Sequence, residues 1–284
     1  MKKETFYIGA DRGGTLTRIA MLDRSLKLAK SVSFATEEDY QAFAEKLCSV
    51  LQEWNVIDSP LVIASRGAFT RAEVREGIAA AVNAVSGGKA NLKAVISDAV
   101  AAHYAAFGGE SGILLISGTG AVAFSGKYGH YEKHGGDNPV EGDPGSGRWL
   151  GRKWLVYKGN LQENEEMDHA ESASYAKKVL ENAENAQNLN LHGKNVSQED
   201  SFCLGIARQG AEQLAALVRM AAAADRQAVQ GGFIYAAYQG GTMQSRFYRD
   251  LLSKCYKAMY RAELVLFPLP FQASEAAAML AAKL

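Results

Sequence analysis

A glycine turn near the N-terminus combines groups that can hold a phosphate. In Asp11-Arg12-Gly13-Gly14-Thr15-Leu16-Thr17, a carboxylate ends an apolar run and two glycines follow it. Glycines let backbone N–H groups approach an anion closely, and the hydroxyls of Thr15 and Thr17 add hydrogen-bond donors. A Gly-Gly pair between two apolar runs is also typical of an ordinary hairpin turn, so this segment alone leaves both interpretations open.

A second turn, Ser117-Gly118-Thr119-Gly120, repeats this chemistry further along the chain. Two such turns can hold a polyphosphate from both sides, which a single turn cannot do. The sequence contains no GxxxxGK[ST] loop, and no GxGxxG follows an expected strand. P-loop and dinucleotide-binding interpretations therefore lack support.

Asp98 stands where an apolar strand is expected to end and a helix to begin. An aspartate in that place can accept the proton of an alcohol that attacks a phosphoryl group. The alternative is structural, because Ser97 or Asp98 is also a good N-cap for the helix that follows. Both roles stay open at this point.

A further carboxylate lies in Gly142-Asp143-Pro144-Gly145-Ser146-Gly147. Asp143 can hydrogen-bond sugar hydroxyls or hold a metal-bound water, although Asp-Pro-Gly-Ser is also an ordinary turn and helix-cap sequence. The five histidines show no metal-ligand spacing, and we expect them on the surface or in loops. The three cysteines form no CxxC pair, which disfavours zinc, iron–sulfur and disulfide frameworks and predicts buried thiols.

Composition narrows the classes of partner. The 284 residues include 31 Lys+Arg and 31 Asp+Glu, so the formal net charge is zero. A balanced charge gives no general basic field for nucleic acid or an acidic membrane, and an anionic ligand must be held locally. No window approaches the roughly 18 uninterrupted apolar residues of a membrane span. We expect a cytoplasmic protein that binds neither nucleic acid nor membrane.

The order of strands and helices predicts an α/β fold with helices packed on a sheet. Strands are expected at 6–11, 17–23, 26–34, 61–64 and 92–98, with helices at 37–53, 71–85 and 99–107. The pair Gly108-Gly109 looks like a domain boundary and hinge, after which 112–124 repeats the opening strand-turn-strand pattern. Residues 127–148 are expected to form a long functional loop. Helices at 202–224 and 248–260, a strand at 263–267 and an alanine-rich terminal helix follow.

Taken in order, these motifs resemble the BadF/BadG/BcrA/BcrD ATPase family and, within it, the N-acetylglucosamine kinases. Those enzymes belong to the superfamily of sugar kinases, actin and heat-shock chaperone ATPases. Val229-Gln230-Gly231-Gly232-Phe233 resembles the adenosine motif of the family, and residues 268–281 resemble its closing segment. The resemblance covers nearly the whole chain.

The resemblance implies two ribonuclease-H-like (actin-like ATPase) domains with a nucleotide cleft between them. The N-terminal domain would span 1–108, completed by the helix 272–284, and the C-terminal domain would span 109–271. The ligands would be ATP, Mg²⁺ and a sugar. Asp11 would act near the metal, Asp98 would be the base that takes the sugar hydroxyl proton, and Asp143 with Gly120 would help to hold the sugar. The other nucleotide contacts implied are Gly13, Gly14, Thr15, Thr17, Gly118, Thr119 and Gly120 for phosphates and Gly231 with Gly232 for adenosine.

The chain departs from the family pattern at several positions. Arg12 replaces a glycine, Leu16 a frequent lysine, Pro144 a glutamate and Gln230 a serine. We expect an ATP-dependent kinase of an amino sugar, either N-acetylglucosamine or a muramic-type relative. A non-catalytic nucleotide or sugar sensor is the alternative. A dehydratase-activating ATPase is disfavoured because it needs iron–sulfur cysteines near glycine turns. Monomer and homodimer are both left open.

Overall fold

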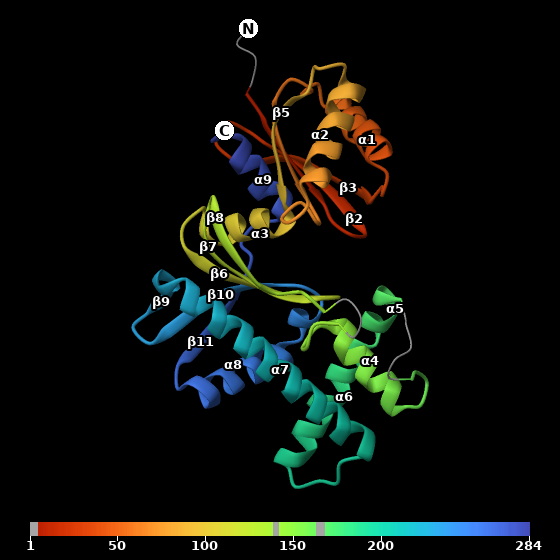
Figure 1. Ribbon diagram of the computed structural model, residues 1–284, viewed down its shortest axis with the longest axis vertical. Coiled ribbons are helices and arrows are strands. Elements are labelled where there is room, and N and C mark those ends of the chain that lie inside the picture. The colour runs from red at the N-terminus through yellow and green to blue at the C-terminus, as the bar shows by residue number, and fades with distance from the viewer. Residues whose placement is uncertain (1–4, 139–141, 163–167) are drawn as a thin grey trace. The chain divides into compact units, whose positions relative to one another are not determined.

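The computed structural model describes residues 5–138, 142–162 and 168–284 (Figure 1). The chain divides into two compact units. Unit 1 comprises Met1–Gly108 with Leu269–Leu284, and unit 2 comprises Gly109–Pro268. Within the described ranges, no helix is both long and apolar enough to cross a membrane.

Unit 1 is built on a five-stranded sheet in the order β3-β2-β1-β4-β5. β1 runs antiparallel to β2 and parallel to β4, and β4 is parallel to β5. The carboxyl ends of β1, β4 and β5 therefore meet at one edge of the sheet. The strands are β1 (Tyr7–Arg12), β2 (Leu16–Leu22), β3 (Leu28–Ala35), β4 (Pro60–Ser65) and β5 (Asn91–Ser97).

Helices cover both faces of this sheet. α1 (Tyr40–Glu53) and α2 (Ala72–Ser86) pack their apolar stripes on one face, around Phe43, Leu47 and Ile78. α3 (Asp98–Phe107) and α9 (Ala273–Ala281) cover the other face with small side chains. The C-terminal helix α9 thus belongs to the core of unit 1 although most of the chain separates it from β1.

Gly9 explains how closely α9 approaches the sheet. A Cβ at this position would lie 2.0 Å from the carbonyl oxygen of Ser274 and 2.3 Å from the backbone nitrogen of Ala278. Real Cβ atoms do not come this near to backbone atoms, so only glycine fits. Gly9, two residues before the first glycine turn, therefore serves helix packing within unit 1.

Unit 2 repeats the strand order with β11-β10-β6-β7-β8, and the short β9 pairs antiparallel with β10. β6 is antiparallel to β7 and parallel to β10. The strands are β6 (Gly112–Ser117), β7 (Ala121–Lys127), β8 (His130–Gly135), β9 (Val229–Gln230), β10 (Phe233–Gln239) and β11 (Glu263–Pro268). β8 corrects the prediction of a loop over 127–148. It is a partly exposed edge strand of mostly polar residues, so it carries no apolar alternation.

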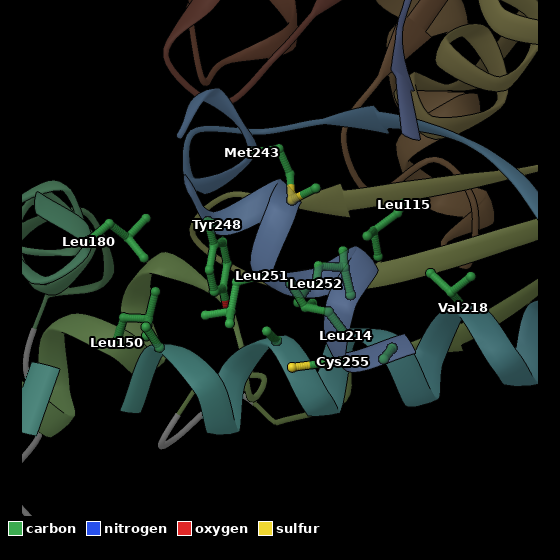
Figure 2. Packing of buried hydrophobic residues seen from close by; sticks show 14 of the residues in the cluster. Leu115, Leu150, Leu180, Leu214, Val218, Met243, Tyr248, Leu251, Leu252 and Cys255 are labelled. Carbon is green, nitrogen blue, oxygen red and sulfur yellow. The ribbon is translucent and has the colours of Figure 1, made fainter. Parts of the chain in front are cut away.

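Figure 1 shows α7 and α8 along one face of this sheet. Their apolar side chains meet in the core seen in Figure 2, which contains Leu214 and Val218 of α7 together with Tyr248 and Leu252 of α8. All three cysteines are buried and unpaired, as predicted. The helices of unit 2 are α4 (Gly147–Tyr157), α5 (His169–Ser174), α6 (Ala176–Leu191), α7 (Gln198–Ala224) and α8 (Arg246–Tyr260), with short 3₁₀ turns at Arg226–Ala228 and Thr242–Gln244.

Candidate functional site

The carboxyl edge of the unit 1 sheet carries most of the predicted chemistry. The last residues of β1, β4 and β5 are in register, so the residues that follow them, Gly13, Arg66 and Asp98, leave the edge side by side. The N–H of Arg66 donates to the carbonyl oxygen of Arg12 at 3.2 Å, which continues the ladder past the strand ends. This edge therefore holds the first glycine turn, a guanidinium and a carboxylate next to one another.

Asp11 is a buried carboxylate at the end of β1, with 9% of its surface exposed. Burial is the main cause that raises the pKa of Asp11 from 3.8 to about 6, and the negative charge of Asp98 raises it further. Arg18, its partner across the β1–β2 pair, acts in the opposite direction but more weakly. The positive charge of Arg18 therefore offsets only part of the effect of burial and of Asp98 on the ionised Asp11.

Asp98 is the first residue of α3, and Ser97 is the N-cap. Its Oδ1 accepts hydrogen bonds from the Ser97 hydroxyl at 3.0 Å and from the Ala99 N–H at 2.9 Å. Its Oδ2 has no hydrogen-bond partner among the residues described, and the side chain is partly exposed. Asp98 is therefore oriented through one oxygen and can accept a hydrogen bond from a ligand hydroxyl through the other.

The first glycine turn is only partly available to a ligand. Gly14 and Thr15 are exposed. The Gly13 N–H donates to the Leu16 carbonyl oxygen at 3.2 Å, and the Thr17 hydroxyl is buried and bonded to the Thr36 hydroxyl at 3.0 Å. The structure thus places Gly14 and Thr15 where a phosphate can reach them, but it commits the Thr17 side chain to the interior.

The guanidinium of Arg12 binds other residues of unit 1. Its Nη2 donates to the carbonyl oxygens of Glu37 and Glu38, both at 2.7 Å, and its guanidinium stacks over the ring of Tyr40. Arg12 therefore fixes the segment before α1 against the end of β1. Its departure from glycine has a structural role.

The second glycine turn, in unit 2, rests on the start of α4. The Gly118 N–H donates to the Gly120 carbonyl oxygen at 2.9 Å, and the Gly147 N–H donates to the Gly118 carbonyl oxygen at 2.6 Å. Ser146 caps α4 by accepting from the Trp149 N–H. Thr119 and Gly120 stay exposed.

A cavity of about 630 Å³ adjoins this turn within unit 2. Its size lies in the range of small-molecule sites, and much of its lining is apolar while Lys177, Glu181 and Glu184 of α6 add charge. The glycine Gly240, with φ of 111°, brings the end of β10 against Ser117. The remaining lining residues are Gly118, Thr119, Gly147, Ala173, Ala176, Leu180, Gly241, Thr242, Gln244, Ser245, Arg246 and Phe247.

Gly231 and Gly232 do not line this cavity. They form the turn between β9 and β10, with φ of 58° and 84°, and no atom lies within 4 Å of a Cβ added to either one. Gly241, just beyond the other end of β10, lines the cavity instead, and sequence reasoning missed it. The available signal was topological: β10 is parallel to β6, so a ligand at the turn after β6 meets the carboxyl end of β10.

Asp143 is tied to the second turn. Its Oδ2 accepts from the Ala121 N–H at 2.8 Å and its Oδ1 from the Asn138 N–H at 3.1 Å. It also lines a smaller cavity of about 390 Å³ together with Thr119, Gly120 and Arg148. Within the described ranges, no group of three or more His, Cys, Asp or Glu side chains could by itself hold a metal ion.

No family model matches the chain, and no curated protein matches it by sequence, so the BadF/BadG/BcrA/BcrD resemblance stays a prediction. Solved structures match at low identity. A candidate N-acetylglucosamine kinase of Chromobacterium violaceum is 20% identical with a TM-score of 0.67, covering 98% of this chain and 99% of that one. A candidate N-acetylglucosamine kinase of Porphyromonas gingivalis is 16% identical with a TM-score of 0.65, covering 96% and 97%.

A ROK family glucokinase of Streptomyces griseus, in complex with glucose and AMPPNP, is 15% identical with a TM-score of 0.61, covering 98% of this chain and 99% of that one. Likeness at these identities shows the fold. The protein has the two-domain fold of the actin-like sugar kinases.

Proposed function

We propose that this protein is an ATP-dependent carbohydrate kinase. The observation that carries the proposal is Asp98, whose Oδ1 is fixed by two hydrogen bonds while Oδ2 is left for a ligand. Asp98 leaves the same sheet edge as the exposed glycine turn of Gly14 and Thr15. A base beside a phosphate-binding turn is the arrangement that phosphoryl transfer to an alcohol requires.

In this reaction the acceptor hydroxyl oxygen attacks the γ-phosphorus while the bond to the departing ADP breaks. Asp98 accepts the hydroxyl proton through Oδ2. Within unit 1, Gly14 and Thr15 are the proposed N–H and hydroxyl donors to a phosphate. Within unit 2, Gly118 and Thr119 are the proposed phosphate contacts. The adenosine occupies the cavity bordered by Gly241, in place of the predicted Gly231-Gly232 contact.

The residues present fit a magnesium ion carried by ATP. Asp11 and Asp98 carry like charges near enough to raise the pKa of Asp11, so a divalent cation would relieve that repulsion. Mg²⁺ commonly uses only one or two protein carboxylates together with substrate phosphates and water, which agrees with the absence of a larger acidic cluster in the described ranges. When bound, the ion would neutralise charge on the phosphates.

The proposed acceptor is an amino sugar, either N-acetylglucosamine or a muramic-type relative. Two of the matching structures are candidate N-acetylglucosamine kinases, and a third is a glucokinase with glucose bound. Asp143 and Gly120, which line the smaller cavity, are the proposed sugar contacts in unit 2.

The proposal is tested by coupled ADP release with Mg²⁺ and ATP across a panel of free sugars. Sugar-dependent release is expected, and Asp98→Asn should lower kcat by about 10²- to 10⁴-fold, the usual contribution of a general base. Asp23→Asn is the matched control, because Asp23 follows β2 at the end away from the first glycine turn. Its Oδ1, which accepts from the backbone N–H groups of Ser25 and Lys27, is kept in asparagine. Equal rates in wild type and Asp98→Asn would contradict the proposal.

One observation favours a second candidate, a nucleotide or sugar sensor without turnover. The Gly13 N–H and the Thr17 hydroxyl, two predicted phosphate donors, are engaged within unit 1. If ATP raises the melting temperature but no sugar causes ADP release, the sensor replaces the kinase. A dehydratase-activating role is disfavoured further, since all three thiols are buried.

A further inference from the structure

Arg66 is a cationic side chain that the sequence motifs did not single out. It is the first residue after β4, and its N–H bonds to the Arg12 carbonyl oxygen, so its backbone is held beside the end of β1. The register of β1, β4 and β5 places it between Gly13 and Asp98. Its position is therefore set by the sheet, although it lies in a connecting loop.

The guanidinium of Arg66 lies against the first glycine turn. A Cβ on Gly14 would be 2.7 Å from its Nη1. The side chain is exposed, and its guanidinium has no hydrogen bond or ion pair among the residues described. An unengaged cation thus stands directly over the backbone that is proposed to receive a phosphate.

The other arginine side chains near this turn interact with groups of unit 1. Arg12 is buried and bonded to the carbonyl oxygens before α1. Arg18 stands opposite Asp11 in the β1–β2 pair, where its charge acts on that carboxylate. Residues 11–17 contain no lysine. Arg66 is therefore the cation available for a charge that develops next to Gly14.

We propose that Arg66 is a further catalytic residue, whose guanidinium contacts the transferring phosphoryl group of ATP; this rests on the proposed kinase function. In the transition state, negative charge spreads over the three equatorial oxygens of that group. A planar guanidinium can donate to two of them at once. The bond from the acceptor oxygen to phosphorus forms, the bond to ADP breaks, and the proton goes to Asp98. Arg66 keeps its own protons throughout.

The position over Gly14 favours the phosphoryl group over an anionic substituent of the acceptor as the partner of Arg66. The two occupants predict different kinetics. Contact with the phosphoryl group acts on kcat, because the charge it meets is greatest in the transition state. Contact with a carboxylate on the sugar acts on the KM of that sugar.

The first experiment compares Arg66→Gln with Arg24→Gln, an exposed arginine after β2 at the opposite end of the same sheet. Arg66→Gln should lower kcat at least about 100-fold, in line with arginine contacts in other phosphoryl transfers. The KM of the sugar should stay within about twofold, Arg66→Lys should recover part of the loss, and Arg24→Gln should match wild type. An unchanged kcat, or a rise confined to the KM of the sugar, would overturn the proposal.

A second experiment needs no turnover. Binding of Mg²⁺ with AMPPNP and of Mg²⁺ with ADP is measured by calorimetry for the same variants. Arg66→Gln should weaken AMPPNP about tenfold or more and leave ADP within about twofold, because only AMPPNP carries the third phosphate. Equal weakening of both, or no nucleotide binding by wild type, overturns the role. If wild type turns over no sugar yet the AMPPNP-specific loss is seen, the kinase proposal fails while the phosphate contact of Arg66 stands.

Discussion

The two glycine turns follow strands of equal length in sheets of the same order, yet their surroundings differ. β1 ends in Asp11 and Arg12, whereas β6 carries Ile116 and Ser117 at the same places. The first turn has a free guanidinium over it, from Arg66. The second turn is held by backbone hydrogen bonds from the start of α4 and adjoins the 630 Å³ cavity.

The difference shows that the two units carry different groups around equivalent turns. Unit 1 gathers charge at its sheet edge, through Asp11, Asp98 and Arg66. Unit 2 instead has a cavity beside its turn, lined by residues of α4, α6 and the start of α8. The shared strand order fixes where both turns lie, and the surrounding residues decide what each turn contributes.

The largest expected effect is on stability, and it compares Gly9, against which α9 packs, with Gly118 in the second turn. Gly9→Ala in β1 places a Cβ 2.0 Å from the Ser274 carbonyl oxygen, so α9 must move, and we expect a loss of about 3 kcal/mol in the free energy of unfolding. Gly118→Ala in the second turn meets its nearest atom at 3.7 Å, an ordinary contact, and should cost less than about 1 kcal/mol. Urea unfolding measures both variants.

This prediction is contradicted if Gly9→Ala and Gly118→Ala lower the free energy of unfolding equally. It also fails if Gly9→Ala leaves the urea midpoint unchanged, since α9 would then yield without cost. Leu114, at the place in β6 that corresponds to Gly9, is fully buried, so a larger side chain at this strand position is possible only where no helix approaches as closely as α9.

A smaller effect, of opposite sign, is expected at Asp11. A pKa raised from 3.8 to about 6 means that the folded state holds this proton more tightly than the unfolded state, so stability is lost as pH rises through 6. Asp11→Asn removes the buried charge and should raise the free energy of unfolding by about 2 kcal/mol at pH 8, with the gain fading to near zero at pH 4. Unfolding curves of both proteins across this range test it.

A gain that does not depend on pH would show that burial of the charge is not the cause. The same variant should lose kinase activity, because Asp11 is the proposed metal contact. Both results together would show that the Asp11 carboxylate destabilises the fold above pH 6 and is still needed for turnover. Charge would then be the feature that distinguishes the first turn from the second.

Strand and helix positions could largely be predicted, because apolar periodicity records which face of each element is buried. β8 could not, since an exposed polar edge strand carries no such pattern. The glycine turns and Asp98 were found as local motifs. Arg66 was missed because its place depends on the register of three parallel strands that are distant in sequence.

The two Gly-Gly pairs show the same limit. Gly231-Gly232 and Gly240-Gly241 flank one strand, and local sequence does not say which end of β10 meets the second turn. The parallel pairing of β10 with β6 decides it. In the same way, the motif contains both Thr15 and Thr17, but only the β2–β3 pairing buries Thr17 against Thr36.

The smallest expected change in stability, at Gly14, gives the sharpest test of how the first glycine turn works. Gly14→Ala would place a Cβ 2.7 Å from Nη1 of Arg66, the far end of a flexible exposed side chain, so the side chain can move and the free energy of unfolding should change by less than about 0.5 kcal/mol. Activity should nevertheless fall, since the guanidinium no longer lies over the turn. Because the alanine acts through Arg66, its effect on kcat should largely vanish in the Arg66→Gln background, as a double-mutant cycle would show. Additive losses would mean that Gly14 acts on the phosphate independently of Arg66.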